Sequence, residues 1–121
     1  MLRLSRAEFE WAVTRALHGL PAEIAAYLNN VAIVVEDEPT DEELRAVGLD
    51  PNTETLFGLY QGVSLPDRGA DYSLALPDRI VIYRVPLLAE CETRDELIQE
   101  IRDTVIHEIG HYFGLDEEDL P

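Results

Sequence analysis

The sequence predicts an α+β fold in which a small mixed β-sheet of about three strands packs against helices. Three β-branched or aromatic runs, 31–35, 55–60 and 79–85, predict the strands. Apolar residues at helical spacing near both ends of the chain predict the flanking helices. The length of 121 residues suits one hydrophobic core, so we expect a single domain over residues 1–121.

The first predicted helix begins at a capping box. Ser5 is typical of an N-cap, and Glu8 stands three residues later, where its side chain can bond back to the cap. Helical spacing of apolar residues then continues to Gly19. Pro21 favours the start of a short second helix over 22–28.

The segment 31–35 is continuously apolar and predicts a buried strand. It is followed by 36–43, which holds six acidic residues and a proline. This run lacks the spacing of a calcium loop, and we expect a solvated loop. Thr40 is a suitable cap for a short helix that ends at Val47.

Two further strands complete the predicted sheet. The run 55–60 leads into a loop over 63–69, which contains proline and glycine. The run 79–85 is opened by Asp78 and closed by Pro86.

The last predicted helix runs from 94 to about 113. Thr93 and Glu96 form a second predicted capping box, and Gly114 is the expected C-terminal glycine. On a helical wheel, one side collects the apolar residues Ile98, Ile101, Val105, Ile109 and Tyr112.

The opposite side of this helix carries His107-Glu108-Ile109-Gly110-His111, an HExxH pattern. Residues four apart share a helix face, so both imidazoles can point at one metal ion. Glu108 is rotated off their line, where it can act as general base toward a water molecule held by the metal. The pattern therefore predicts a Zn²⁺ site with His107 and His111 as ligands and Glu108 as the catalytic residue.

A catalytic zinc usually has three protein ligands and a water molecule. Gly114 allows the chain to turn after the helix and bring back an acidic residue from the segment 116–119. Glu117 is the first candidate for the third ligand and Asp116 the second. A water molecule in that position remains an alternative.

Residues 107–117 resemble the HExxHxxGxx(H/D) signature of the zincin metallopeptidases. A closer resemblance is to the minimal zincins, a small bacterial group of zincin-like metallopeptidases. Segments 56–63 and 76–80 are similar to strand segments of that group, so the resemblance covers most of residues 31–120.

This resemblance implies a role for each residue of the motif. His107, His111 and Glu117 would bind zinc and Glu108 would be the base, with Glu117 standing where the signature usually has His or Asp. It also implies a small mixed sheet on helices, without the second lobe that walls a protease cleft. Substrate would then pair with an exposed strand edge, for which the strands of Tyr60 and Tyr83 are the candidates.

The amino-acid composition limits the classes of partner that we expect for this protein. Nine arginines and no lysine stand against 25 acidic residues, which gives a net charge of −16. Such a charge disfavours nucleic acid and anionic membranes and favours cations, including metal ions. One cysteine, Cys91, excludes an internal disulfide. With no apolar run of 18 residues and no apolar signal-peptide centre, we expect a cytoplasmic protein; nothing predicts its oligomeric state.

The sequence thus favours a zinc-dependent metallopeptidase that acts on a peptide or protein substrate. Two alternatives stay open at this point. One is a zinc-binding module without turnover, and the other is a metal-free interaction domain with a vestigial motif.

Overall fold

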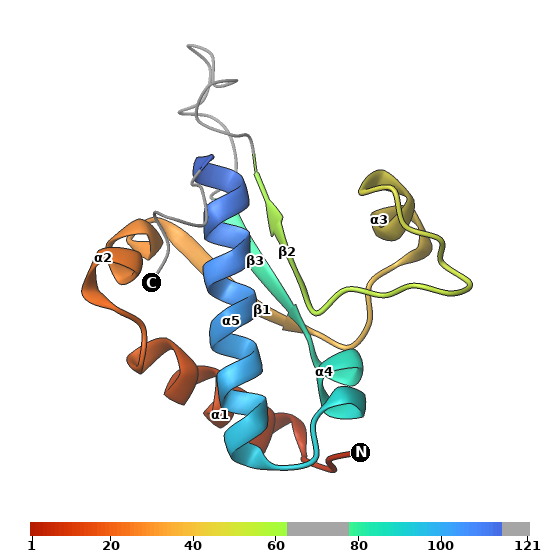
Figure 1. Ribbon diagram of the computed structural model, residues 1–121, viewed down its shortest axis with the longest axis horizontal. Coiled ribbons are helices and arrows are strands. Elements are labelled where there is room, and N and C mark those ends of the chain that lie inside the picture. The colour runs from red at the N-terminus through yellow and green to blue at the C-terminus, as the bar shows by residue number, and fades with distance from the viewer. Residues whose placement is uncertain (63–77, 115–121) are drawn as a thin grey trace.

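The computed structural model describes residues 1–62 and 78–114. Their elements follow the order helix, helix, strand, helix, two strands, two helices (Figure 1). The helices are α1 (Arg6–His18), α2 (Ala22–Ala25) with the 3₁₀ turn η1 (Ala26–Leu28), α3 (Asp41–Ala46), α4 (Arg84–Glu90) and α5 (Arg94–Phe113). The strands are β1 (Val31–Glu36), β2 (Gly58–Gln61) and β3 (Asp78–Tyr83).

The described strands form one mixed sheet in the order β1-β3-β2. β1 pairs with β3 in parallel, with Val31 opposite Asp78, and β2 pairs with β3 antiparallel, with Gly58 opposite Ile82. The predicted α+β class with a three-stranded mixed sheet is therefore confirmed.

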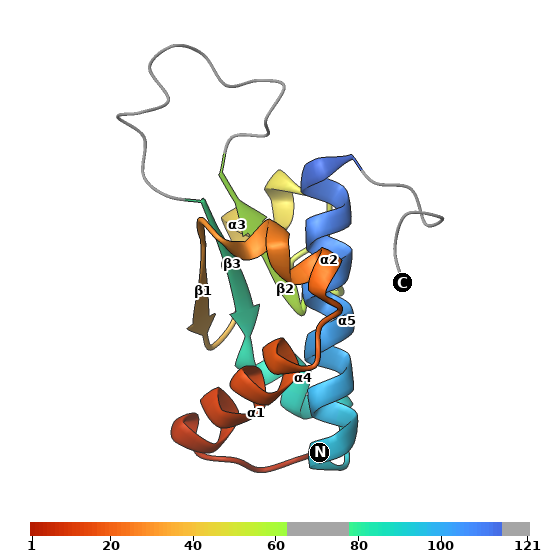
Figure 2. The same cartoon turned by 90° about the vertical axis from the view of Figure 1, so that its left-hand side faces the viewer.

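The main core lies between the sheet and the helices α1 and α5. Ile80 and Ile82 of β3 are fully buried and belong to the same apolar cluster as residues from both helices. Figures 1 and 2 show α1 and α5 on the same side of the sheet, with α5 running beside β2. The fully buried members of this cluster from the helices include Phe9, Ala12, Ala16, Leu97, Ile101, Val105 and Ile109.

The opposite face of the sheet carries Tyr83, because successive side chains of a strand point to opposite faces. Tyr83 is fully buried, and α3 lies on this side (Figure 1). Burial raises the pKa of Tyr83, and the negative charge of Glu43 in α3 raises it further. Glu43 also accepts a hydrogen bond from Gln61 at 2.7 Å, which ties α3 to the end of β2.

The predicted first helix and its capping box are both present, with Ser5 as N-cap and Glu8 bonded back to it. The short helix capped by Thr40 also forms, with Val47 as its C-cap. α5 ends at Gly114, whose φ of 65° is left-handed, as expected for a helix-terminating glycine.

Helix α4 is missing from the sequence prediction, which extended the third strand to residue 85. Pro86 is the third residue of this helix, where the backbone N–H that proline lacks has no partner within the helix. The proline therefore stands in a helical first turn instead of ending a strand.

Three other boundaries or environments differ from the prediction. The strand predicted over 31–35 is half-buried instead of fully buried, because β1 lies on the outside of the described sheet. β2 begins at Gly58, three residues later than expected. The second capping box is half formed: Thr93 accepts from the N–H of Glu96, whereas the Glu96 side chain accepts from Glu92.

Within 1–62 and 78–114, no helix is long and apolar enough to cross a membrane. The loop expected over 63–69 lies outside the described residues.

Candidate active site

The two histidines of the motif stand one turn apart on the exposed side of α5. Their Nε2 atoms are 3.0 Å apart. Two Zn–N bonds of about 2.0–2.1 Å in tetrahedral geometry place the two nitrogens about 3.3 Å apart. The pair of Nε2 atoms at His107 and His111 therefore fits two ligand positions of a single zinc ion.

Glu108 lies on the side of α5 that faces β2. Its Oε1 accepts a hydrogen bond of 2.9 Å from the backbone N–H of Tyr60. The backbone N–H of Tyr83 in β3 donates to the carbonyl oxygen of Phe57, so the backbone groups of Phe57 point toward β3. Because these groups alternate in direction along a strand, the N–H groups of Gly58 and Tyr60 point outward, away from β3. The outward N–H of Tyr60 is thereby satisfied by the motif carboxylate, which fixes the carboxylate against the strand.

Two tyrosines and an aspartate join β2, β3 and α5 next to the motif. The rings of Tyr60 and Tyr112 are stacked, with centroids 3.9 Å apart and an interplanar angle of 8°. Both hydroxyls donate to Oδ2 of Asp78, at 3.3 Å from Tyr60 and 2.7 Å from Tyr112. Asp78 is only 5% exposed, so its carboxylate is a buried acceptor between three elements.

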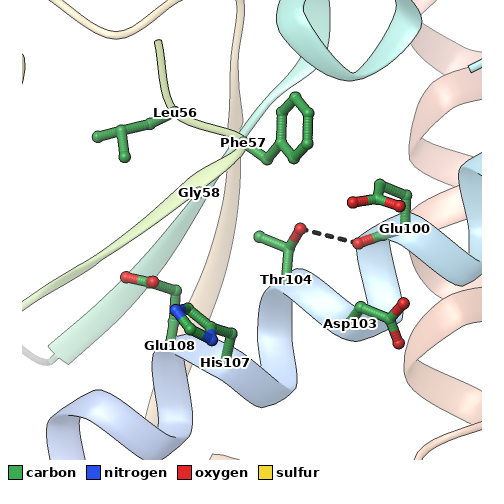
Figure 3. Close-up of a pocket in the computed structure, with 8 residues that line it drawn as sticks. All are labelled: Leu56, Phe57, Gly58, Glu100, Asp103, Thr104, His107 and Glu108. Carbon is green, nitrogen blue, oxygen red and sulfur yellow. Dashed lines mark hydrogen bonds between the residues drawn. The ribbon is translucent and has the colours of Figure 1, made fainter. Parts of the chain in front are cut away.

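Two cavities meet at the motif and share Leu56, Gly58, His107 and Glu108. The first, of about 320 Å³, extends toward Glu100, Asp103 and Thr104 on α5 (Figure 3). The second, of about 500 Å³, extends the other way, where its lining includes the aliphatic side chains of Val47, Leu49, Leu56 and Leu59. The motif thus lies in the middle of a groove between β2 and α5, with one acidic and one apolar end.

Gly58 allows this close approach of strand and helix. A Cβ atom at this position would lie 2.6 Å from Cγ2 of Thr104 and 3.1 Å from the carbonyl oxygen of Val81. The absence of a side chain is therefore what lets β2 run along α5 at the level of the motif.

Among the predicted site residues, His107, Glu108 and His111 are brought together at one groove. Glu117 and its alternative Asp116 lie outside the described residues, and their roles as third ligand stay predictions. Within the described part of the chain, no group of three or more His, Cys, Asp or Glu residues could hold a metal ion. Asp103, which lines the first cavity, accepts a hydrogen bond from Gln99 of the same helix at 2.8 Å.

The sequence prediction placed Tyr112 in the core and gave Asp78 no role beyond opening a strand. Tyr112 is instead half-buried, lines the larger cavity and bonds to Asp78. The amide of Tyr60 gave no sequence signal, because every residue except proline carries a backbone N–H. A polar residue at the start of an apolar strand was the one available hint for Asp78.

The two strands predicted as candidate edges for substrate occupy different places in the sheet. β2, which contains Tyr60, lies on the outside of the described sheet and next to α5. β3, which contains Tyr83, is the central strand and pairs on both sides. The candidate edge at Tyr83 was therefore wrong.

Comparison with known proteins gives the same fold. The structure of a conserved hypothetical protein from Thermus thermophilus superposes on this one with a TM-score of 0.58 at 20% sequence identity. The superposition covers 91% of this chain and 94% of the Thermus chain. The search of curated proteins found no match to the sequence. The family model of the zincin-like metallopeptidases matches residues 28–121, which includes the sheet, α5 and the HExxH pattern. The chain belongs to the zincin-like metallopeptidase family.

Proposed function

We propose that the protein is a zinc-dependent peptidase that hydrolyses peptide bonds in the groove between β2 and α5. The observation that carries this proposal is the convergence of three groups at one point of the groove. The Nε2 atoms of His107 and His111 are 3.0 Å apart, and Glu108 lines the same cavity with its carboxylate held by Tyr60.

His107 and His111 would hold the ion, with Glu117 as the proposed third ligand and Asp116 or a water molecule as the alternatives. When bound, zinc supplies Lewis acidity, which polarises a carbonyl group and lowers the pKa of water toward about 7. Neutral imidazoles suit this ion, and a carboxylate can complete the set.

Glu108 would act as general base and take a proton from the attacking water molecule. The bond from Tyr60 to Oε1 fixes the orientation of the carboxylate and leaves Oε2 to accept that proton. The same carboxyl group can then donate the proton to the amine that leaves when the peptide bond breaks. Orientation by a rigid strand reduces the reorganisation that this transfer requires.

An extended peptide is the substrate that suits the groove. Alternation along β2 directs the N–H and C=O of Gly58 outward, so a peptide could add to this edge by backbone hydrogen bonds. The chain carries a charge of −16, and Glu100 and Asp103 line one end of the groove. Neutral or basic peptides are therefore favoured over acidic ones.

The test compares zinc-loaded wild type with Glu108→Gln on a broad peptide library. Glutamine retains an oxygen that can accept from the Tyr60 N–H, but it cannot accept the proton, so the variant isolates the role of the base. We expect hydrolysis to fall by about 10²–10⁴-fold with zinc content unchanged. Equal hydrolysis by both proteins would exclude this mechanism.

The same experiment separates a peptidase from a zinc-binding module. Zinc that raises the thermal stability of wild type, with no cleavage of any peptide in the library, would indicate a module without turnover. Removal of zinc by a chelator should abolish hydrolysis in wild type, and its restoration should recover it.

A further inference from the structure

The contacts of Asp78 connect the start of β3 to both of the elements that form the groove. Its Oδ2 accepts from Tyr112 on α5 at 2.7 Å and from Tyr60 on β2 at 3.3 Å. Because Asp78 is 5% exposed, these donors replace much of the hydration that a carboxylate loses on burial. Hydrogen bonds to a buried charged group are among the stronger ones in a protein.

Each tyrosine is in turn attached to the motif. Tyr112 follows His111 directly in α5, and its hydroxyl donates to Asp78, so this bond links β3 to the helix next to His111. Tyr60 makes two attachments, since its hydroxyl donates to Asp78 while its backbone N–H donates to Glu108 at 2.9 Å. The stacked rings, 3.9 Å apart, hold the two tyrosines together.

Asp78 is itself held firmly. It is the first residue of β3 and lies opposite Val31 in the parallel ladder with β1. A Cβ atom on Gly62 would clash with its carboxylate oxygen Oδ1, so the backbone after β2 passes directly beside the carboxyl group. The short side chain is therefore fixed by the central strand that carries it.

We propose that Asp78 is a positioning residue, which acts through the hydroxyls of Tyr60 and Tyr112 to set α5 and the Glu108 carboxylate against β2. Asp78 does not contact the reacting atoms in this arrangement. Its effect is on the orientation of Glu108 and on the approach of the His107 and His111 pair. The inference rests on the proposed peptidase function for its catalytic consequence, but its structural part can be tested without zinc or substrate.

The first test measures amide hydrogen exchange in the metal-free full chain. Tyr112→Phe keeps the stacked ring and removes the hydroxyl that donates at 2.7 Å. We expect exchange of the Tyr60 amide, which donates to Glu108, to become about tenfold faster. The amide of Tyr83, which donates to Phe57 across the ladder, should keep its protection.

The matched control is Tyr27→Phe, which also removes one hydroxyl from a tyrosine that packs on α5. The ring of Tyr27 lies 4.5 Å from that of Phe113, and the residue takes no part in the Asp78 contacts. This variant should leave exchange of the Tyr60 amide unchanged. Equal acceleration at the Tyr60 and Tyr83 amides in Tyr112→Phe would indicate a merely structural role and overturn the proposal, as would no acceleration at either.

The second test measures zinc affinity and hydrolysis. Residues that orient metal ligands typically change metal affinity by about 10–100-fold when they are replaced. We expect Tyr112→Phe to lose about tenfold in zinc affinity and about tenfold in kcat, with KM nearly unchanged. Asp78→Asn keeps an acceptor oxygen, so its zinc affinity and kcat should fall less than those of Asp78→Ala.

The outcomes separate this inference from the proposed function. If wild type cleaves no peptide, the proposed function fails, while the exchange result still decides whether Asp78 positions Glu108. If wild type is active and Tyr112→Phe matches it in kcat, zinc affinity and Tyr60 exchange, the inference fails and the proposed function stands. The tyrosine variants keep the test valid if Asp78→Ala does not fold.

Discussion

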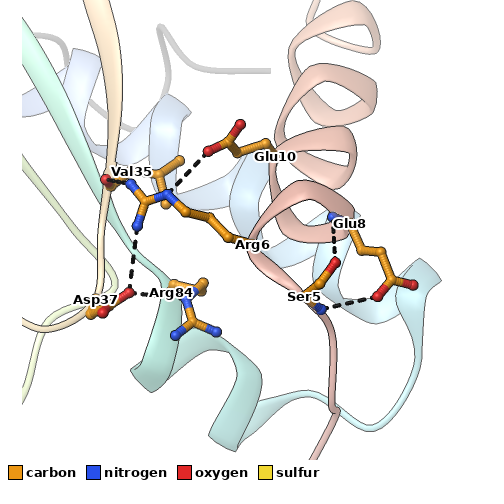
Figure 4. A network of polar contacts seen from close by, with 7 residues as sticks. All are labelled: Ser5, Arg6, Glu8, Glu10, Val35, Asp37 and Arg84. Atoms are coloured by element: carbon orange, nitrogen blue, oxygen red, sulfur yellow. Dashed lines mark hydrogen bonds and ion pairs between the residues drawn. The ribbon is translucent and has the colours of Figure 1, made fainter.

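The two outer strands of the described sheet differ in the side chains that bond to their outward backbone groups. At β1, the carbonyl oxygen of Val35 accepts from the Arg6 guanidinium at 2.6 Å (Figure 4). Arg6 also pairs with Glu10 at 3.2 Å and with Asp37 at 3.6 Å, and its side chain is 54% exposed. Asp37 in turn pairs with Arg84 at 3.0 Å. This edge is therefore protected by solvated side chains.

At β2, the outward N–H of Tyr60 is instead bonded to the half-buried carboxylate of Glu108, which lies within the motif. A charged arginine can block an edge against another strand without any further role. At β2, the residue that accepts the hydrogen bond from the strand is Glu108, the proposed base. Protection of an edge and assembly of a site can therefore depend on the same hydrogen bond.

The largest expected effect comes from His107→Ala, which removes one of the two nitrogens beside the β2 edge. Stoichiometric zinc that survives dialysis in wild type should be lost in this variant, because the remaining histidine cannot form the site alone. Metal analysis after dialysis measures this. The control is His18→Ala, since His18 is the third histidine and lies in the last turn of α1. Equal zinc content in His107→Ala and wild type would contradict the assignment.

Gly58→Ala should separate β2 from α5. The added Cβ would lie 2.6 Å from Cγ2 of Thr104 and 3.1 Å from the Val81 carbonyl oxygen. We expect a loss of about 1–3 kcal/mol in the free energy of unfolding, measured in urea, because overpacking forces the neighbours to move. Peptide hydrolysis should fall as well, because Glu108 loses its place against the strand.

The double variant Gly58→Ala/Thr104→Ser is the matched control. Serine lacks the Cγ2 atom but keeps the hydroxyl that donates to the Glu100 carbonyl oxygen at 2.8 Å (Figure 3). Part of the stability should return, but not all of it, because the contact with Val81 remains. If the double variant is no more stable than Gly58→Ala, the proposed steric cause is wrong.

Local sequence signals predicted most of the fold. Caps such as Ser5 with Glu8 and terminators such as Gly114 act within a few residues, so they can be recognised from the chain alone. α4 was missed because Pro86 is compatible both with the end of a strand and with the first turn of a helix. Its position could be decided only by the packing of Leu87 and Leu88 into the core.

The site was predictable in its helical part. His107, Glu108 and His111 belong to one helix, so their relative placement follows from helix geometry. Tyr60 and Asp78 come from two strands. The bond from Tyr60 to Glu108, and the bonds from Tyr60 and Tyr112 to Asp78, depend on strand order and register, which no local pattern contains. The burial of Asp78 beneath two tyrosines is likewise a tertiary property.

Glu43→Gln should change how the free energy of unfolding depends on acidic pH. Glu43 lies in α3 and bonds to Gln61 at the end of β2. Desolvation alone would raise the pKa of Glu43, but the hydrogen bonds that its carboxylate accepts, with the one from the Thr40 backbone the strongest, together outweigh it and lower the pKa. Because the folded-state pKa is depressed, this stabilisation is present above the unfolded pKa and is lost as pH falls through the folded pKa. The free energy of unfolding of the variant should therefore depend less on pH in acid than that of wild type. The difference should be less than about 1 kcal/mol, because Glu43 is partly exposed to solvent.

Urea unfolding of wild type and Glu43→Gln at a series of acidic pH values measures this difference. Glutamine at the third helical position can still accept from the Thr40 N–H, so the cap of α3 is retained. Parallel pH profiles for the two proteins would contradict the assigned cause.

The smallest effect is expected at the other edge of the sheet, from Arg6→Ala. Its ion pairs are exposed, and such pairs typically contribute about 0.2–1 kcal/mol. The loss of unfolding free energy should shrink in about 1 M salt, where charges are screened within about 3 Å. Hydrolysis and zinc content should stay at the wild-type level, because β1 lies on the opposite side of β3 from β2 and its contact with the motif. A large loss of activity in Arg6→Ala would show that the two edges are coupled through the sheet, and the contrast between a protective and a functional edge would then be wrong.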